Sequence, residues 1–95
     1  EQGYKAQVLA KACVNVALVK IRLDADYLGN ESINLDTDSC DILPINKDGD
    51  VYTISTQGVV GSVLRKNRAI VTRAEDPETL EVTLTLDSWQ EVADL

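Results

Sequence analysis

Hydrophobic and polar positions follow a helical period over the first quarter of the chain. Residues 4–26 contain neither Gly nor Pro, and winding them at 100° per residue gathers most polar side chains on one narrow strip. The strip consists of Gln7, Lys11, Asn15 and Arg22. Most other positions on the winding are apolar. The pattern predicts one helix over about residues 4–26, ending in a loop that contains Gly29.

The apolar arc of this helix is wider than packing on one sheet requires. Leu18 falls within the polar strip, and Val14 and Ile21 flank it. Either Leu18 is a single exposed apolar side chain, which is common, or this flank packs against the helix of another copy. The second interpretation predicts a subunit contact at Val14, Leu18 and Ile21 or at residues beside them.

The period changes to two after the helix. Ile33 and Leu35 alternate with polar residues, and so do the apolar positions between Leu80 and Leu86. Asp48-Gly49 is a strong hairpin dipeptide between two such stretches. Strands are therefore expected within about residues 33–89, and they number about four.

This order of elements predicts an α+β fold, with one long N-terminal helix packed on an antiparallel meander sheet of about four strands. A length of 95 residues fits one domain over residues 1–95. The sequence contains no internal repeat and no low-complexity tract.

Charge and composition exclude several classes of function. Sixteen acidic residues against nine basic ones give a net charge of −7, which argues against binding to nucleic acid or to anionic lipid. The chain has no His, and so it lacks the usual general base and the Ser-His and Cys-His nucleophile pairs. We expect no catalytic residues and a protein that is not an enzyme.

Two cysteines lie in different elements, Cys13 in the helix and Cys40 in the strand region. They are either reduced core thiols, since free Cys is often buried, or a disulfide that joins the helix to the sheet. In the chain-entropy model a loop of this length stabilises the fold by about 3.5 kcal/mol. A core with few aromatic residues favours the disulfide, and with it an oxidising compartment.

Acidic residues crowd around the middle of the chain. The stretch from Asn46 begins like a calcium loop, but Val51 replaces the Gly at its sixth position and Gln57 replaces the Glu at its twelfth. A solvated hairpin tip is the preferred interpretation. Calcium held by Asp36, Asp38 and Asp41 stays an alternative, and otherwise no metal or cofactor is expected.

Residues 57–61, QGVVG, resemble the QxVxG hairpin with which cystatins enter the clefts of cysteine proteases. The inhibitor wedge would then consist of Gln57, Val59, Gly61 and Trp89, although no Pro precedes Trp89 as in that family. A third alternative is a small adhesion or carbohydrate-binding domain. Its surface would include Asp36, Asp38 and Trp89.

Several stretches of the chain together carry a further resemblance: the helix stretch 12–22, the loop 27–31, Cys40, the glycine-bearing run 58–61 leading to Arg65-Lys66, and the tail 88–92. With them, most of the chain, residues 4–92, resembles the globular part of a type IV pilin or pseudopilin, especially small minor pilins. This resemblance implies a structural subunit of an extracellular type IV pilus-like filament or secretion pseudopilus, which polymerises through the N-terminal helix.

The same resemblance implies partners and a location. The partners would be other copies, other pilin subunits and the inner-membrane machinery that assembles them. Members of the family carry a strongly apolar N-terminal segment, and this chain begins at Glu1 rather than Met. We therefore expect an apolar segment upstream of Glu1 that anchors the subunit in the membrane before assembly at the cell surface.

Overall fold

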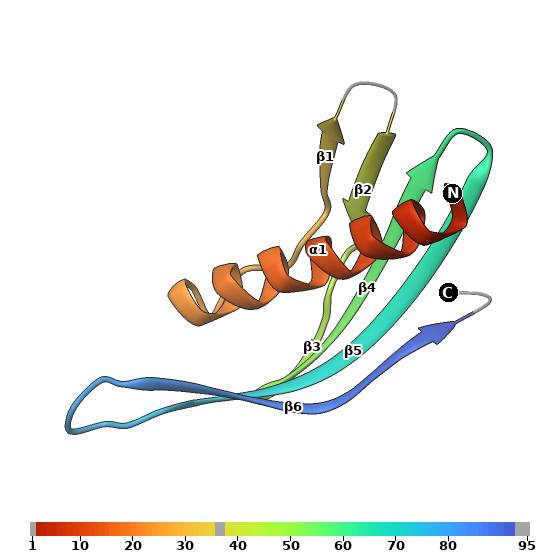
Figure 1. The fold of residues 1–95 in the computed structure, drawn as a ribbon. Helices are drawn as coiled ribbons and strands as arrows, with labels where there is room; N and C mark the ends of the chain where they lie inside the picture. The colour runs from red at the N-terminus through yellow and green to blue at the C-terminus, as the bar shows by residue number, and fades with distance from the viewer. Residues whose placement is uncertain (1, 36–37, 93–95) are drawn as a thin grey trace.

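The computed structural model describes residues 2–35 and 38–92, which form one helix and six strands (Figure 1). The elements are α1 (Gln2–Leu23), β1 (Glu31–Leu35), β2 (Asp38–Ile42), β3 (Asn46–Asp48), β4 (Val51–Val60), β5 (Val63–Glu75) and β6 (Val82–Val92). The α+β prediction of one N-terminal helix on an antiparallel sheet is confirmed. The expected number of about four strands is too low.

All neighbouring strands are antiparallel, in the order β1-β2-β4-β5-β6, and β3 also pairs with β4. β2 and β3 share one edge of β4 and are separated by residues 43–45. Pro44 lies in this gap and has no N–H to donate to the ladder, which explains the interruption. Residues 31–48 thus form three short strands.

The helix crosses one face of the sheet (Figure 1). Its buried residues recur at the spacing of one helix face: Ala6, Ala10, Cys13, Val14, Ala17 and Ile21. They pack on side chains from the inner face of the sheet, among them Ile42, Tyr52, Ile54 and Val71. In β4 buried and less buried residues alternate along all ten positions, because every second side chain points toward the helix.

Helix and sheet approach most closely at Gly58. A Cβ atom built on Gly58 would overlap the carbonyl oxygen of Ala6 and lie 2.8 Å from the nitrogen of Ala10. Two residues away in β4, the buried Thr56 hydroxyl donates a hydrogen bond of 2.7 Å to the carbonyl oxygen of Ala10. The absence of a side chain at Gly58 and the hydroxyl of Thr56 therefore determine the position of α1 on β4.

The last turn of α1 is held from the sheet. Arg73 of β5 donates from Nε to the carbonyl oxygen of Ile21 at 3.0 Å and from a terminal nitrogen to that of Arg22 at 3.4 Å. These carbonyl groups lack partners within the helix, and a cation there also complements the helix dipole. The helix ends at Leu23, about three residues before the predicted end and ahead of Gly29.

A disulfide joins Cys13 of α1 to Cys40 of β2, as the sequence predicts, with their Cα atoms 6.1 Å apart. Both cysteines are buried in the core between helix and sheet. On the far side, the long β5–β6 hairpin extends well beyond the helix (Figure 1). The molecule is consequently elongated, with principal extents of 48 × 24 × 19 Å.

Candidate functional site

The face of α1 that points away from the sheet is largely apolar. Tyr4 is 70% exposed, Val19 58% and Leu23 80%. Val8 and Ala12 are also exposed and lie between them along the helix. We call these five residues the outer strip. The spacing of four or seven residues places them on one side of the helix, opposite the buried face.

The predicted contact residues are not on this outer strip. Val14 and Ile21 are both 0% exposed and belong to the core, and Leu18 is partly buried beside it. The prediction centred the exposed face on the polar strip through Lys11 and Asn15. The observed exposed face is centred on Val8 and Val19, roughly 60° further round the helix. Val14 and Ile21 are therefore covered by this chain's own sheet.

The outer strip continues into a hollow of about 310 Å³ between the start of α1 and the β1–β2 hairpin. Its lining is mainly apolar and includes Tyr4, Val8, Leu9 and Leu35. Leu35 of β1 is itself exposed. At the edge of the hollow, Lys5 and Asp38 form an ion pair of 3.8 Å.

A polar contact joins the second half of α1 to β1. The Lys20 ammonium donates to both carboxylate oxygens of Glu31 at 2.7 Å and lies 5.5 Å from the centre of the Tyr27 ring. The hydrogen bond from Lys20 and the neighbouring Tyr27 hydroxyl hold the pKa of Glu31 below its usual value. Burial and the negative charge of Glu31 raise the pKa of Tyr27. Within the described residues the buried Tyr27 hydroxyl has no partner in full hydrogen-bond geometry.

The residues of the cystatin-like wedge do not lie together at one edge of the molecule. Gln57 and Val59 belong to β4 and point to the face of the sheet opposite α1. Gln57 Nε2 donates a hydrogen bond of 2.8 Å to Asp41 Oδ2 there. Gly61 lies in the turn to β5, and Trp89 is on the helix side of β6, opposite the buried Ala69. The structure therefore separates Trp89 from Gln57 and Val59 by the thickness of the sheet.

The predicted calcium ligands are also separated. Asp38 lies on the helix side of β2, and Asp41, three positions on, lies on the opposite face. Asp36 is outside the described residues. Within residues 2–35 and 38–92, no group of three or more acidic or cysteine side chains is placed to hold a metal ion.

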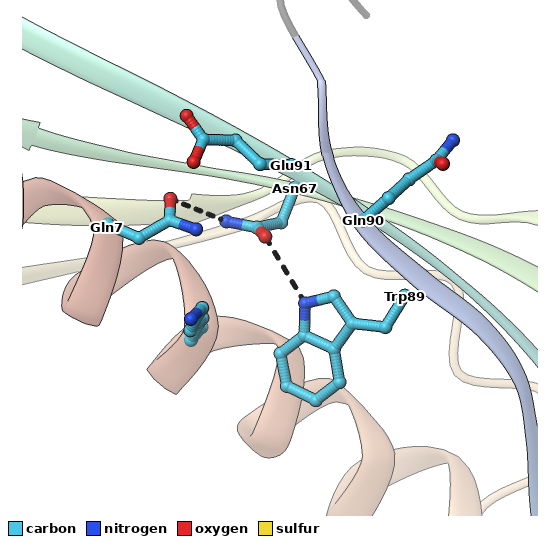
Figure 2. A pocket seen from close by; sticks show the side chains of 6 residues that line it. Gln7, Asn67, Trp89, Gln90 and Glu91 are labelled. Carbon is cyan, nitrogen blue, oxygen red and sulfur yellow. Dashed lines mark hydrogen bonds between the residues drawn. The ribbon is translucent and has the colours of Figure 1, made fainter.

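A second hollow, of about 460 Å³, opens between α1 and β6 (Figure 2). Trp89 lies there beside residues that we did not predict from the sequence. It is lined by Gln7, Lys11, Asn67, Trp89, Gln90 and Glu91. Asn67 is fully buried, yet polar. The alternation of Asn67 with Ala69 and Val71 was the available signal that its side chain points inward.

Hydrogen bonds connect three of these side chains in a row (Figure 2). Trp89 Nε1 donates to Asn67 Oδ1, and Asn67 Nδ2 donates to Gln7 Oε1, each at 3.2 Å. The row spans β6, β5 and α1, and it fixes the orientation of the indole ring relative to the helix.

No protein-family model, curated protein or solved structure matches this chain. Of the described helical residues, none form a segment long and apolar enough to cross a membrane.

Proposed function

We propose that this chain is a structural subunit, a minor pilin or pseudopilin, of an extracellular type IV pilus-like filament or secretion pseudopilus. In this proposal it polymerises through α1. The observation that carries the proposal is the outer strip, because α1 exposes apolar side chains on the side opposite its buried face.

A helix that packs on one sheet needs one apolar face. Here the buried face is already complete, with six residues that are 0% exposed. The fold buries only part of each apolar side chain of the outer strip, whereas complete burial of a Val or Leu side chain is worth about 1.5–3 kcal/mol. A contact between copies would supply that burial, and the strip replaces Val14, Leu18 and Ile21 as the proposed contact.

The geometry of the strip suits an open assembly. It runs the length of α1, from Tyr4 to Leu23, so one copy can place the second half of its helix against the first half of the next. Such a heterologous contact generates an open helical fibre when the rotation between successive copies does not close into a ring. The apolar hollow beside Tyr4 and Leu35 widens the surface available at one end.

The remaining parts of the proposal follow from the family resemblance. The partners are other copies, other pilin subunits and inner-membrane assembly machinery, and an apolar segment upstream of Glu1 anchors the subunit before assembly. The disulfide between Cys13 and Cys40 supports an extracellular location, since such bonds persist in oxidising compartments.

Cross-linking of introduced cysteines tests the head-to-tail contact. In Val8→Cys/Val19→Cys, a bismaleimide reagent should yield a ladder of oligomers, because position 8 of one copy meets position 19 of the next. Each single variant should give no cross-linked ladder, because the partner position then carries no cysteine. The native cysteines are buried and bonded to each other, and so they do not compete for the reagent.

The matched control is Thr83→Cys/Ser88→Cys, two exposed positions of β6 that are away from the outer strip. It should give no ladder under the same conditions. A double Val variant that stays monomeric at high protein concentration, or a control that forms an equal ladder, contradicts assembly through α1.

A further inference from the structure

The hollow at Trp89 exists because one helix covers a wide sheet. α1 lies over β2, β4 and β5, and β6 is left partly uncovered at the sheet edge (Figure 1). Trp89 is half-buried there, and the flank of α1 that carries Gln7 lies across from it (Figure 2). Lys11, one helical turn after Gln7, also lines the hollow. A volume of about 460 Å³ is within the usual range of small-ligand sites, about 300–1,000 Å³.

The polar groups of the hollow are organised before any ligand arrives. Asn67 is 0% exposed and is held on both sides, by Trp89 and by Gln7. Because Gln7 accepts through Oε1, its Nε2 group retains the capacity to donate two hydrogen bonds. Fixed polar groups beside an aromatic ring lower the ordering cost of binding.

The charges around the hollow favour a neutral ligand. Its lining holds one cation, Lys11, and one anion, Glu91, and the Glu91 carboxylate also pairs with Arg65 at 3.8 Å. The net charge of −7 over the whole chain disfavours phosphorylated or otherwise anionic ligands. An aromatic ring and amides with few net charges suit a molecule that has both apolar faces and hydroxyl groups.

We propose that this hollow binds a neutral saccharide. The C–H face of a sugar ring packs on the indole of Trp89, and its hydroxyl groups exchange hydrogen bonds with Gln7 and with Lys11 or Glu91 at the rim. This binding site is separate from the outer strip of α1, and it does not depend on filament assembly. Of the residues predicted for an adhesion surface, Trp89 lines this hollow and Asp38 does not, and Asp36 lies outside the described residues.

An extended peptide paired with the outer edge of β6, where no strand of the described residues pairs, is the competing ligand for this region. The edge of β6 is less suited to pairing with a peptide, because the β5–β6 register shifts between Ile70 and Val71. Asp87 lies in the resulting β-bulge. Such bulges protect edge strands against further pairing. A fluorescence titration with saccharides and with a peptide distinguishes the two classes of ligand.

Tryptophan fluorescence can detect binding in this hollow directly, since Trp89 is the only tryptophan of the protein. We would titrate it with maltose, cellobiose, lactose and N,N′-diacetylchitobiose to tens of millimolar and record tryptophan emission. At least one saccharide should produce a saturable blue shift. An alternating Thr-Val hexapeptide and sialyllactose, an anionic sugar, should produce none.

Two glutamine variants distinguish saccharide binding in the hollow from binding elsewhere on the surface. Gln7→Ala removes a lining amide and should weaken saccharide binding about fivefold, the effect of one lost hydrogen bond. Gln57→Ala, on the opposite face of the sheet, should bind as the unchanged protein does. The proposal is overturned if no saccharide gives a saturable shift, if only the hexapeptide does, or if Gln7→Ala and the unchanged protein bind equally.

Discussion

Individual residues decide how closely α1 approaches the sheet. Gly58 leaves space that the carbonyl of Ala6 occupies, and Thr56 donates its hydroxyl to Ala10 from the same strand. Both residues face the helix from β4. The other buried positions of this strand carry larger side chains that point toward the helix. The contact is therefore sensitive to one added carbon.

Gly58→Ala should destabilise the protein by about 2–3 kcal/mol, in the range of overpacked cores. The added Cβ meets main-chain atoms of Ala6 and Ala10 rather than a flexible side chain, and so the helix itself must shift. Urea unfolding followed by circular dichroism measures the loss.

Gly49→Ala is the control for this substitution. Gly49 has a φ of +61°, and nothing lies within 4 Å of a Cβ built on it. Its replacement should cost only about 1 kcal/mol, the conformational cost of an L-residue in that region. Equal losses in the two variants would show that the approach at Gly58 is not tight.

Glu31 gives the stability of the fold a dependence on pH. Its pKa is lower in the folded protein than its usual value of 4.5, because Lys20 hydrogen-bonds to the charged form and the neighbouring Tyr27 hydroxyl also favours it. The folded state thus gains stability that is present above about pH 4.5 and is lost as the pH falls through the folded pKa. Glu31→Gln should be less stable than the unchanged protein at neutral pH, and this difference should shrink in acid.

Thermal melting between pH 3 and pH 7 tests this effect, because the range extends to both sides of the usual pKa of 4.5. Glu78→Gln, in the distant β5–β6 turn, is the matched control and should follow the unchanged protein throughout. A constant difference between Glu31→Gln and the unchanged protein at all pH values would contradict a role for the Glu31 charge.

At the scale of elements, the disulfide joins the helix to the first half of the sheet. Cys13 and Cys40 are 27 residues apart in sequence, and the loop between them includes all of β1. Cys13→Ala/Cys40→Ala should lose about 3.5 kcal/mol through the entropy of the opened loop, in addition to lost packing.

Urea unfolding of the two proteins measures this loss. A reducing agent should destabilise the unchanged protein and leave the double variant as it was. A double variant within about 1 kcal/mol of the unchanged protein would show that the closed loop contributes little.

Periodicity in the sequence is strong enough to predict the helix and the antiparallel sheet. The helix is predicted to within about three residues at each end, and the Asp48-Gly49 hairpin joins β3 to β4 as expected. The strand count is wrong because strands as short as β3 carry almost no alternation. Pairing across residues 31–48 depends on contacts with β4 that lie outside any local pattern.

The rotation of the helix was harder to predict than its extent. Lys11 and Asn15 are exposed, as the winding predicts, but Gln7 on the same polar strip is partly buried beside β6. Gln7 hydrogen-bonds to Asn67, and Lys11 lines the same hollow. The helical periodicity of the sequence does not distinguish a polar flank that borders a hollow from one that faces water. For this reason the winding did not indicate that Val14 and Ile21 belong to the core.

At the scale of the whole molecule, one helix covers one face of a sheet that is wider than itself. Among the surfaces that the described residues leave uncovered are the outer strip of α1 and the hollow beside Trp89. The first carries the proposed assembly and the second the proposed saccharide site. The two surfaces lie on different sides of α1, so a subunit can use both at once.

Top-down mass spectrometry of the protein isolated from its natural source tests the filament proposal most directly. A filament subunit should have a mature chain with an apolar segment before Glu1 and a methylated N-terminus, and its mass should include the Cys13–Cys40 disulfide. A mature protein that begins at Glu1 would have neither the membrane anchor nor the apolar helix extension of a pilin. That result would contradict the proposed function.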